Sequence, residues 1–218
     1  MKLGRAWTSP EARRRTSGCA VEQGDAADEV RAGRKPRPSQ LIPDVRQTIG
    51  DAMEAGTQRT RCFGCGGLVP QMDGPTHRYM ESSPGCWHVY GQVLSREYSD
   101  RSFGALHRLT VDSYAVQHPG RPSAQAIQSV CVHLISLCLA LERGLAVAYA
   151  TRVMGAATRT KERFFWLTPP TSLGEVTVAD VGEVATSLQH EEKVRAWAEA
   201  AWSAWAAHHA TVRAWVPV

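Results

Sequence analysis

The segment Cys62-Phe63-Gly64-Cys65-Gly66-Gly67, followed later by Cys86, constrains this chain more than any other feature. Two cysteines separated by two residues, with glycine after the second, are typical of a turn in which two thiolates bind one tetrahedral zinc ion. Cys86 supplies a third thiol. We therefore expect Cys62, Cys65 and Cys86 to bind Zn²⁺ together, which requires a fold that brings Cys86 back to the turn.

The sequence leaves the fourth ligand of this ion open. Ser83 and Pro84 are typical of a helix start and place Cys86 in the first turn, where the helix dipole stabilises a thiolate. His77, in the loop before this helix, is the preferred fourth ligand, and His118 is the alternative. A fourth side-chain ligand is typical of a structural zinc site, whereas a water molecule in that position is typical of a catalytic zinc site.

Two other uses of the cysteine pair fit the sequence less well. A thioredoxin-type redox pair needs its second cysteine at the start of a helix, but Gly66, Gly67 and Pro70 follow Cys65 and disfavour a helix there. A zinc deaminase carries its His-x-Glu motif before the cysteine pair, whereas the matching residues here begin at His190. The chain also lacks a phosphate-binding loop and a dinucleotide-binding fingerprint, so no sequence motif indicates a reaction.

Composition favours one globular domain in a reducing compartment. The chain has 218 residues, 43% of them hydrophobic, which suffices for one sizeable core. Cys131 and Cys138 lie in an apolar helical pattern, so the six cysteines do not suggest a secreted disulfide framework. The longest apolar run is interrupted by His133 and Ser136. We expect a cytoplasmic protein with no membrane association.

The positive charge is concentrated near the N-terminus. Residues 1–40 hold nine Lys and Arg and five Asp and Glu, an excess that equals the formal net charge of +4 of the whole chain. We therefore predict a disordered basic tail over residues 1–58 and a single helical domain over residues 59–218. Met53 is a possible alternative start, which would leave residues 1–52 untranslated. Residues 41–218 hold as many Asp and Glu as Lys and Arg, sixteen of each, so we expect the folded body to bind no nucleic acid.

Apolar residues recur at helical spacing in four segments. The pattern predicts helices from Pro84 to about Tyr98, from about Phe103 to Gln117, from Ala124 to Arg143 with Ser123 as its cap, and from Glu191 to about Trp215. The fold class expected is therefore mainly α: a bundle-like single domain preceded by the zinc-knuckle loop and the tail.

Polar residues within these helices suggest a second kind of site. Asp112, His118, His133 and one of His208 and His209 could gather in a pocket, where Asp112 would orient a histidine that acts as a base or a metal ligand. Two functions thus remain open. One is a zinc-containing module that binds an unknown small molecule or protein, and the other is a zinc- or histidine-dependent enzyme.

Six motifs in fixed order resemble one protein family. They are Cys62-Phe63-Gly64-Cys65-Gly66, Gly74-Pro75-Thr76-His77-Arg78-Tyr79-Met80, Ser83-Pro84-Gly85-Cys86-Trp87, Val111-Asp112-Ser113-Tyr114-Ala115-Val116-Gln117-His118-Pro119-Gly120, Ser129-Val130-Cys131-Val132-His133-Leu134 and Ala207-His208-His209. Together they resemble the bacterial domain of unknown function family numbered 5946, over about residues 60 to 216. The resemblance implies relatives but no reaction, because that family has no assigned activity.

Overall fold

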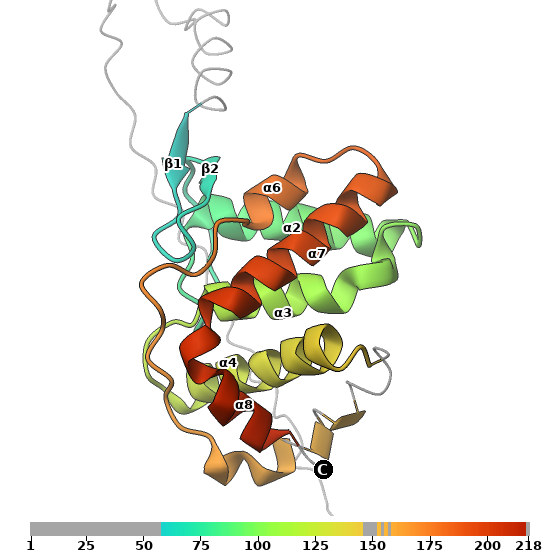
Figure 1. Cartoon of the computed structure of the whole chain (residues 1–218). Coiled ribbons are helices and arrows are strands. Elements are labelled where there is room, and N and C mark those ends of the chain that lie inside the picture. The colour runs from blue at the N-terminus through green and yellow to red at the C-terminus, as the bar shows by residue number, and fades with distance from the viewer. Residues whose placement is uncertain (1–57, 146–151, 154, 157, 217–218) are drawn as a thin grey trace, which may run out of the picture. The chain divides into compact units, whose positions relative to one another are not determined.

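The computed structural model describes residues 58–145, 152–153, 155–156 and 158–216. This part of the chain is mainly helical and carries one two-stranded antiparallel sheet, as the mainly α prediction requires (Figure 1). The strands are β1 (Arg59–Arg61) and β2 (Leu68–Pro70), and the α-helices are α2 (Pro84–Ser99), α3 (His107–Gln117), α4 (Ala124–Leu137), α6 (Val178–Gly182), α7 (Ser187–Ala204) and α8 (His209–Trp215). The predicted tail, except Gln58, and the alternative start at Met53 lie outside the described residues.

The two helix starts predicted from serine and proline are confirmed. The Ser83 hydroxyl accepts a hydrogen bond from the Cys86 amide at the start of α2, and Ser123 does the same for Ala126 at the start of α4. Each bond satisfies an amide that has no partner within its own helix. The cap on α2 fixes Cys86 in the first turn, and this position determines where its sulfur lies.

The predicted helix over Phe103–Gln117 has two parts. A 3₁₀ turn, η1 (Gly104–Leu106), precedes α3, which ends at Gln117 as predicted. The predicted helix over Ala124–Arg143 is also confirmed in extent, but its last turn, η2 (Cys138–Glu142), widens into a π-helix.

The last predicted helix, Glu191 to Trp215, is wrong at both its start and its middle. It begins at Ser187 because Thr186 and Gln189 form a capping box. It breaks after Ala204 into the 3₁₀ turn η4 (Ala206–His208), and α8 follows. The break lets α8 pack against α4, whereas α7 packs mainly on α3.

Helix α3 is central to the described fold and ends at the candidate site. It packs against α4 and against α7, while α2 packs mainly on α6 (Figure 1). Trp197 and Trp205 are fully buried; their indole N–H groups donate to Gln117 Oε1 at 2.7 Å and to the Val116 carbonyl at 3.2 Å. These two bonds anchor the C-terminal end of α3, so the residue after it, His118, has a fixed position.

Among the residues that the structure describes, one helical segment is apolar and long enough to cross a membrane. Residues Ala124–Glu142 form this segment, and just over half of its most apolar part is buried inside the fold. The core helix of a globular domain has the same properties.

Candidate metal centre

The turn between β1 and β2 presents Cys62 and Cys65 on one side. The Cys62 amide donates to the Gly67 carbonyl at 2.8 Å, and the Gly66 amide donates back to the Cys62 carbonyl at 2.8 Å. Gly66 has φ +76°, in the left-handed region that glycine adopts without the Cβ penalty of other residues. The glycine after the second cysteine therefore closes the turn, which is the role the sequence pattern indicates.

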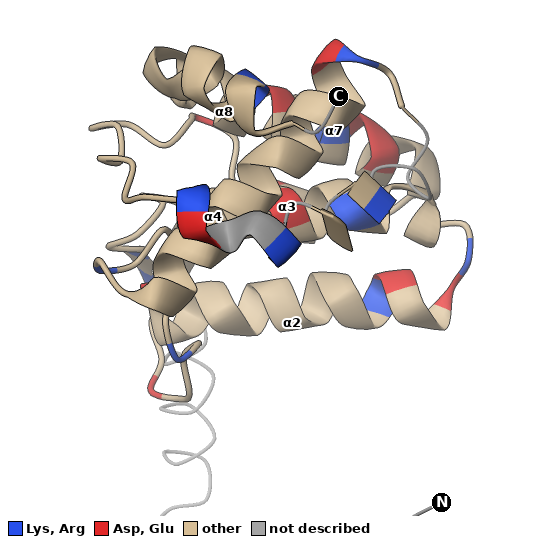
Figure 2. Cartoon of the chain, turned by 90° about the horizontal axis from the view of Figure 1, so that it is seen from below, with Lys and Arg blue, Asp and Glu red and all other residues tan. Residues whose placement is uncertain are grey.

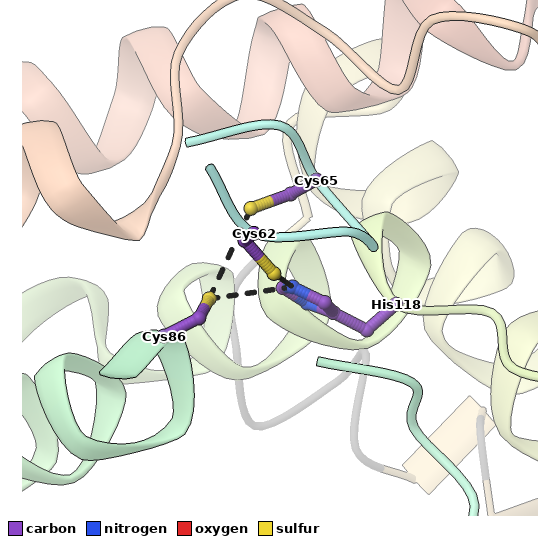
Figure 3. Close-up of side chains that lie close together, drawn as sticks. All are labelled: Cys62, Cys65, Cys86 and His118. Carbon is purple, nitrogen blue, oxygen red and sulfur yellow. Dashed lines mark hydrogen bonds between the residues drawn. The ribbon is translucent and has the colours of Figure 1, made fainter. Parts of the chain in front are cut away.

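Cys86 reaches this turn from the first turn of α2. Its sulfur lies 3.9 Å from the sulfur of Cys65, and all three cysteines are buried (Figure 3). The prediction that the chain brings Cys86 back to the pair is confirmed.

The fourth member of the group is His118, at the C-terminal end of α3. Its Nε2 atom lies 3.4 Å from the sulfur of Cys86 and 3.7 Å from that of Cys62 (Figure 3). Its Nδ1–H donates to the Tyr114 carbonyl at 2.8 Å, one helical turn earlier. This bond assigns the proton to Nδ1 and leaves the lone pair of Nε2 directed at the sulfurs, as in metal-binding histidines.

Gly64 allows the close approach of the turn to His118. A Cβ atom at position 64 would lie 2.6 Å from Cδ2 of His118 and 2.2 Å from the Glu81 carbonyl oxygen. Both distances are shorter than real Cβ contacts, so a side chain here would separate the cysteine turn from His118.

The four ligand atoms have the spacing of a tetrahedral zinc site. They come from Cys62, Cys65, Cys86 and His118, and all lie within 4.8 Å of one another. With Zn–S near 2.3 Å and Zn–N near 2.05 Å, a tetrahedron has S···S edges of about 3.8 Å and S···N edges of about 3.6 Å. The observed separations of 3.9, 3.7 and 3.4 Å agree with these edges. The donor set therefore fits one metal ion.

The electrostatics of the group also favour a cation. Hydrogen bonds with Cys65 and Cys86 lower the pKa of Cys62, which also accepts the Ser83 amide at 3.3 Å. The neighbouring sulfurs of Cys62 and Cys65, together with burial, raise the pKa of Cys86. Burial lowers the pKa of His118, but Cys62 and Cys65 more than offset this and raise it to about 9. Without a metal ion, a proton on Nε2 of His118 therefore balances the thiolate of Cys62. A bound cation would replace this proton, restore the Nε2 lone pair and favour the further thiolates.

His77, the preferred fourth ligand from the sequence, is not in this group. Its ring contacts the rings of Tyr79 and Trp87, with centroids 4.4 and 5.2 Å away, and its Nδ1 accepts from the Tyr79 amide at 3.4 Å. Partial burial lowers its pKa. His77 is close to Cys86 in sequence, but its loop does not bring the ring to the sulfurs. His118 is far from them in sequence, but the end of α3 directs its ring at them. His118 was the alternative that the sequence left open.

The other predicted site residues do not form one pocket. Asp112 and His133 are hydrogen-bonded at 2.7 Å, between α3 and α4. His118 belongs to the cysteine group. His209 stacks on Trp202 with centroids 3.8 Å apart, and its Nε2 bonds to the Trp202 carbonyl at 2.9 Å. His208 bonds to the Thr168 carbonyl at 2.9 Å. The predicted set is therefore divided among separate places, and one pair, Asp112 and His133, comes together.

A second buried polar group was missed by the sequence reasoning. The carboxylate of Glu97 accepts hydrogen bonds from His107, Thr110 and His190, and its side chain is fully buried. The helical pattern gave no signal for it, because Glu97 occupies an ordinary polar position in the sequence of α2.

Comparison with known proteins places the chain in a family. No curated protein and no solved structure matches it. One family model, described as a family of unknown function (DUF5946), matches residues 60–206, which include the four residues of the candidate metal centre. Because this match covers well over half of the chain, the protein belongs to the DUF5946 family of unknown function.

Proposed function

We propose that the protein binds one zinc ion through Cys62, Cys65, Cys86 and His118, and that this ion is structural. The observation that carries the proposal is the meeting of three thiols and one correctly oriented imidazole nitrogen within 4.8 Å, at four buried residues. Thiolate and imidazole ligands in a tetrahedral arrangement select zinc over hard cations such as Mg²⁺ or Ca²⁺.

Four side-chain ligands support a structural role over a catalytic one. Catalytic zinc sites keep a position for water or substrate, whereas a Cys3His set fills the tetrahedron. The ion would join the β1–β2 turn, the start of α2 and the end of α3, which are distant in sequence. Structural zinc contributes about 10–16 kcal/mol of apparent binding free energy to such small folds. The turn and both helix ends then depend on the metal for their arrangement.

We further propose that the zinc-stabilised domain serves as a module for a small molecule or a protein, in a reducing compartment such as the cytoplasm. Free thiols at five described cysteines agree with that environment. Lys and Arg lie among Asp and Glu along the described elements (Figure 2). This mixed distribution favours such partners over nucleic acid, which requires a concentrated basic surface.

Metal content of matched cysteine variants tests the zinc proposal. The native protein, purified without chelator, should contain one zinc per chain by elemental analysis, and Cys62→Ala should lose it. Cys131→Ala is the control, because Cys131 is also buried but lies outside the metal group. Retention of zinc by the control and loss by Cys62→Ala is expected. A native protein that contains no zinc and gains no helical circular dichroism on zinc addition would overturn the proposal.

A histidine pair tests the identity of the fourth ligand. His118→Ala removes the only imidazole of the described Cys3His group, so zinc affinity should fall by at least about tenfold in a competition titration with a chromophoric chelator. His77→Ala should bind zinc as tightly as the native chain. The reverse order of the two affinities would return the role to His77.

A further inference from the structure

A carboxylate and a histidine form a pair outside the metal centre. Asp112 on α3 accepts a hydrogen bond from Nδ1–H of His133 on α4, with Oδ1 and Nδ1 2.7 Å apart. The Asp112 side chain is fully buried, and the His133 side chain is 16% exposed. The carboxylate of Asp112 therefore lies in the interior, and the imidazole of His133 reaches the surface.

The other oxygen of Asp112 has partners of its own. Arg108 donates from Nε to Oδ2 at 3.1 Å, and the Ser136 hydroxyl also donates to Oδ2. Arg108 compensates the buried negative charge, so Asp112 does not depend on a protonated His133 for its stability. Asp112 is thereby held in one orientation, with Oδ1 left for His133.

His133 lines a cavity, and its second ring nitrogen is not used by the bond to Asp112. Nε2 has no hydrogen-bond partner among the residues that the structure describes. His133 lines a cavity of about 250 Å³ together with five other residues, Tyr79, Gln125, Gln128, Ser129 and Val132. Because Nδ1 carries the proton, Nε2 carries a lone pair at the cavity wall.

The cavity lining restricts the ligand. Two carboxamides, two hydroxyl groups and an apolar side chain surround His133, and none of the six lining residues is an acid, a lysine or an arginine. A charged ligand would lose water without gaining an ion pair, whereas an uncharged carbonyl compound can accept hydrogen bonds from the amides and hydroxyls. The volume lies below the usual range for drug-sized ligands, which favours a small molecule.

We propose that Asp112 and His133 form an acid–base site for small uncharged esters, in which His133 is the reacting group and Asp112 its positioning residue. His133 takes a proton from water at Nε2 as the water oxygen bonds to the ester carbonyl carbon. The bond from that carbon to the alcohol oxygen then breaks, and the alcohol leaves with the proton from Nε2. The products are a carboxylic acid and an alcohol, and both residues return to their initial state. The site acts independently of the metal centre.

Reactivity of individual histidines gives the first test. Diethyl pyrocarbonate is a small uncharged acyl compound that carbethoxylates unprotonated ring nitrogens, and peptide mass spectrometry reports the rate at each histidine of the zinc-loaded chain. His88, an exposed histidine on α2, is the internal reference. Exposure alone predicts that His133 reacts more slowly than His88. The proposal predicts that His133 reacts about tenfold faster or more.

Turnover of 4-nitrophenyl acetate gives the second test. His133→Gln should lower kcat by at least about tenfold, since a positioned general base contributes 10²–10⁴-fold. His88→Gln should leave the rate unchanged. Zinc content and melting temperature are measured for both variants, so a failure of folding or of the metal site is recognised separately.

Asp112→Asn tests the positioning role. Because Arg108 and Ser136 both donate to Oδ2, the asparagine carbonyl should take that side and turn its NH₂ toward His133. The ring proton would then move to Nε2 and remove the lone pair from the cavity. ¹H–¹⁵N spectra of the ring should show the change of tautomer, and kcat should fall with little change in KM.

Two results would overturn the proposal: carbethoxylation of His133 slower than that of His88, or unchanged turnover in His133→Gln. If Asp112→Asn does not fold, these two measurements on the native chain and on His133→Gln still decide.

Discussion

Removal of the Glu97 carboxylate should destabilise the domain strongly. Glu97 lies on α2, and its oxygens accept from His107 Nδ1 at 2.7 Å, from Thr110 Oγ1 at 2.5 Å and from His190 Nε2 at 2.8 Å. His107 and Thr110 belong to α3, and His190 belongs to α7. One buried side chain thus joins three helices.

The size of the effect follows from these three bonds. A hydrogen bond to a charged group contributes about 1.5–3 kcal/mol, but the three share one carboxylate and do not add fully. Glu97→Ala also leaves His190 with no partner at either ring nitrogen, because its Nδ1 is already buried without one. Loss of a buried charged partner costs about 3–5 kcal/mol, which is the expected fall in unfolding free energy.

Glu97→Gln should cost less, about 1–2 kcal/mol. Its carbonyl oxygen keeps the bonds from Thr110 and His190, and its NH₂ group can donate to His107 if that ring changes tautomer. The order of the two variants therefore tests the hydrogen-bond assignment as well as the burial.

Urea denaturation of the protein, followed by circular dichroism, provides the measurement. Glu183→Ala is the matched control, because Glu183 pairs with Arg59 at 2.9 Å at the surface, where the two side chains are 63% and 42% exposed. Its loss should cost at most about 1 kcal/mol. A fall below about 1 kcal/mol in Glu97→Ala would show that the buried network does not stabilise the fold as described.

Three further results are expected. Gly64→Ala should lower the unfolding free energy by more than about 2 kcal/mol, because its Cβ would meet the Glu81 carbonyl and the His118 ring. Gly91→Ala is the control: this glycine is at an exposed helical position, and a Cβ there has no atom within 4 Å. It should raise the unfolding free energy by about 0.5–1 kcal/mol. Zinc should be released as the pH falls from about 7 to 4, since protons compete with the metal for the thiolates and for His118, and a chromophoric zinc indicator follows this release. Arg213 lowers the pKa of Glu142 from 4.5 to about 2, so the stabilisation from this pair is present above pH 4.5 and is lost as the pH falls toward 2; Glu142→Gln should remove that part of the acid dependence in denaturation curves.

Each expectation has a contrary outcome. Equal stability of the two glycine variants would mean that the turn is not pressed against His118. Tighter zinc binding in acid would exclude thiolate ligands. An unchanged acid dependence in Glu142→Gln would show that the ion pair with Arg213 does not form in solution.

The local features of the fold could be read from the sequence because their causes are local. Ser83 and Ser123 cap helices through bonds to residues three positions later, so the cap and the helix start appear in one short segment. The break at Trp205 could not be read in this way. The helical spacing of apolar residues continues across the break, so the local sequence predicts one helix. The break accompanies the packing of α8 on α4, and this packing depends on residues far apart in the sequence.

The candidate site shows the same division. The spacing of Cys62 and Cys65 and the helix start before Cys86 predicted that the three cysteines meet in one group, and the structure confirms that meeting. The choice between His77 and His118 depended on the direction in which α3 ends, and on the absence of a side chain at Gly64. The Asp112–His133 pair likewise depended on the register of α3 against α4.

By itself the sequence determined the helical class, the cysteine turn and the capped start of α2, because hydrogen-bond caps, helical periodicity and metal-ligand spacing act over a few residues. Tertiary structure alone decided that His118 joins the three thiols, that Asp112 meets His133, and that Glu97 is buried among two histidines and a threonine. These contacts join residues 10 to 93 positions apart in the chain. Their formation depends on how whole helices pack, and packing is a property of the complete core.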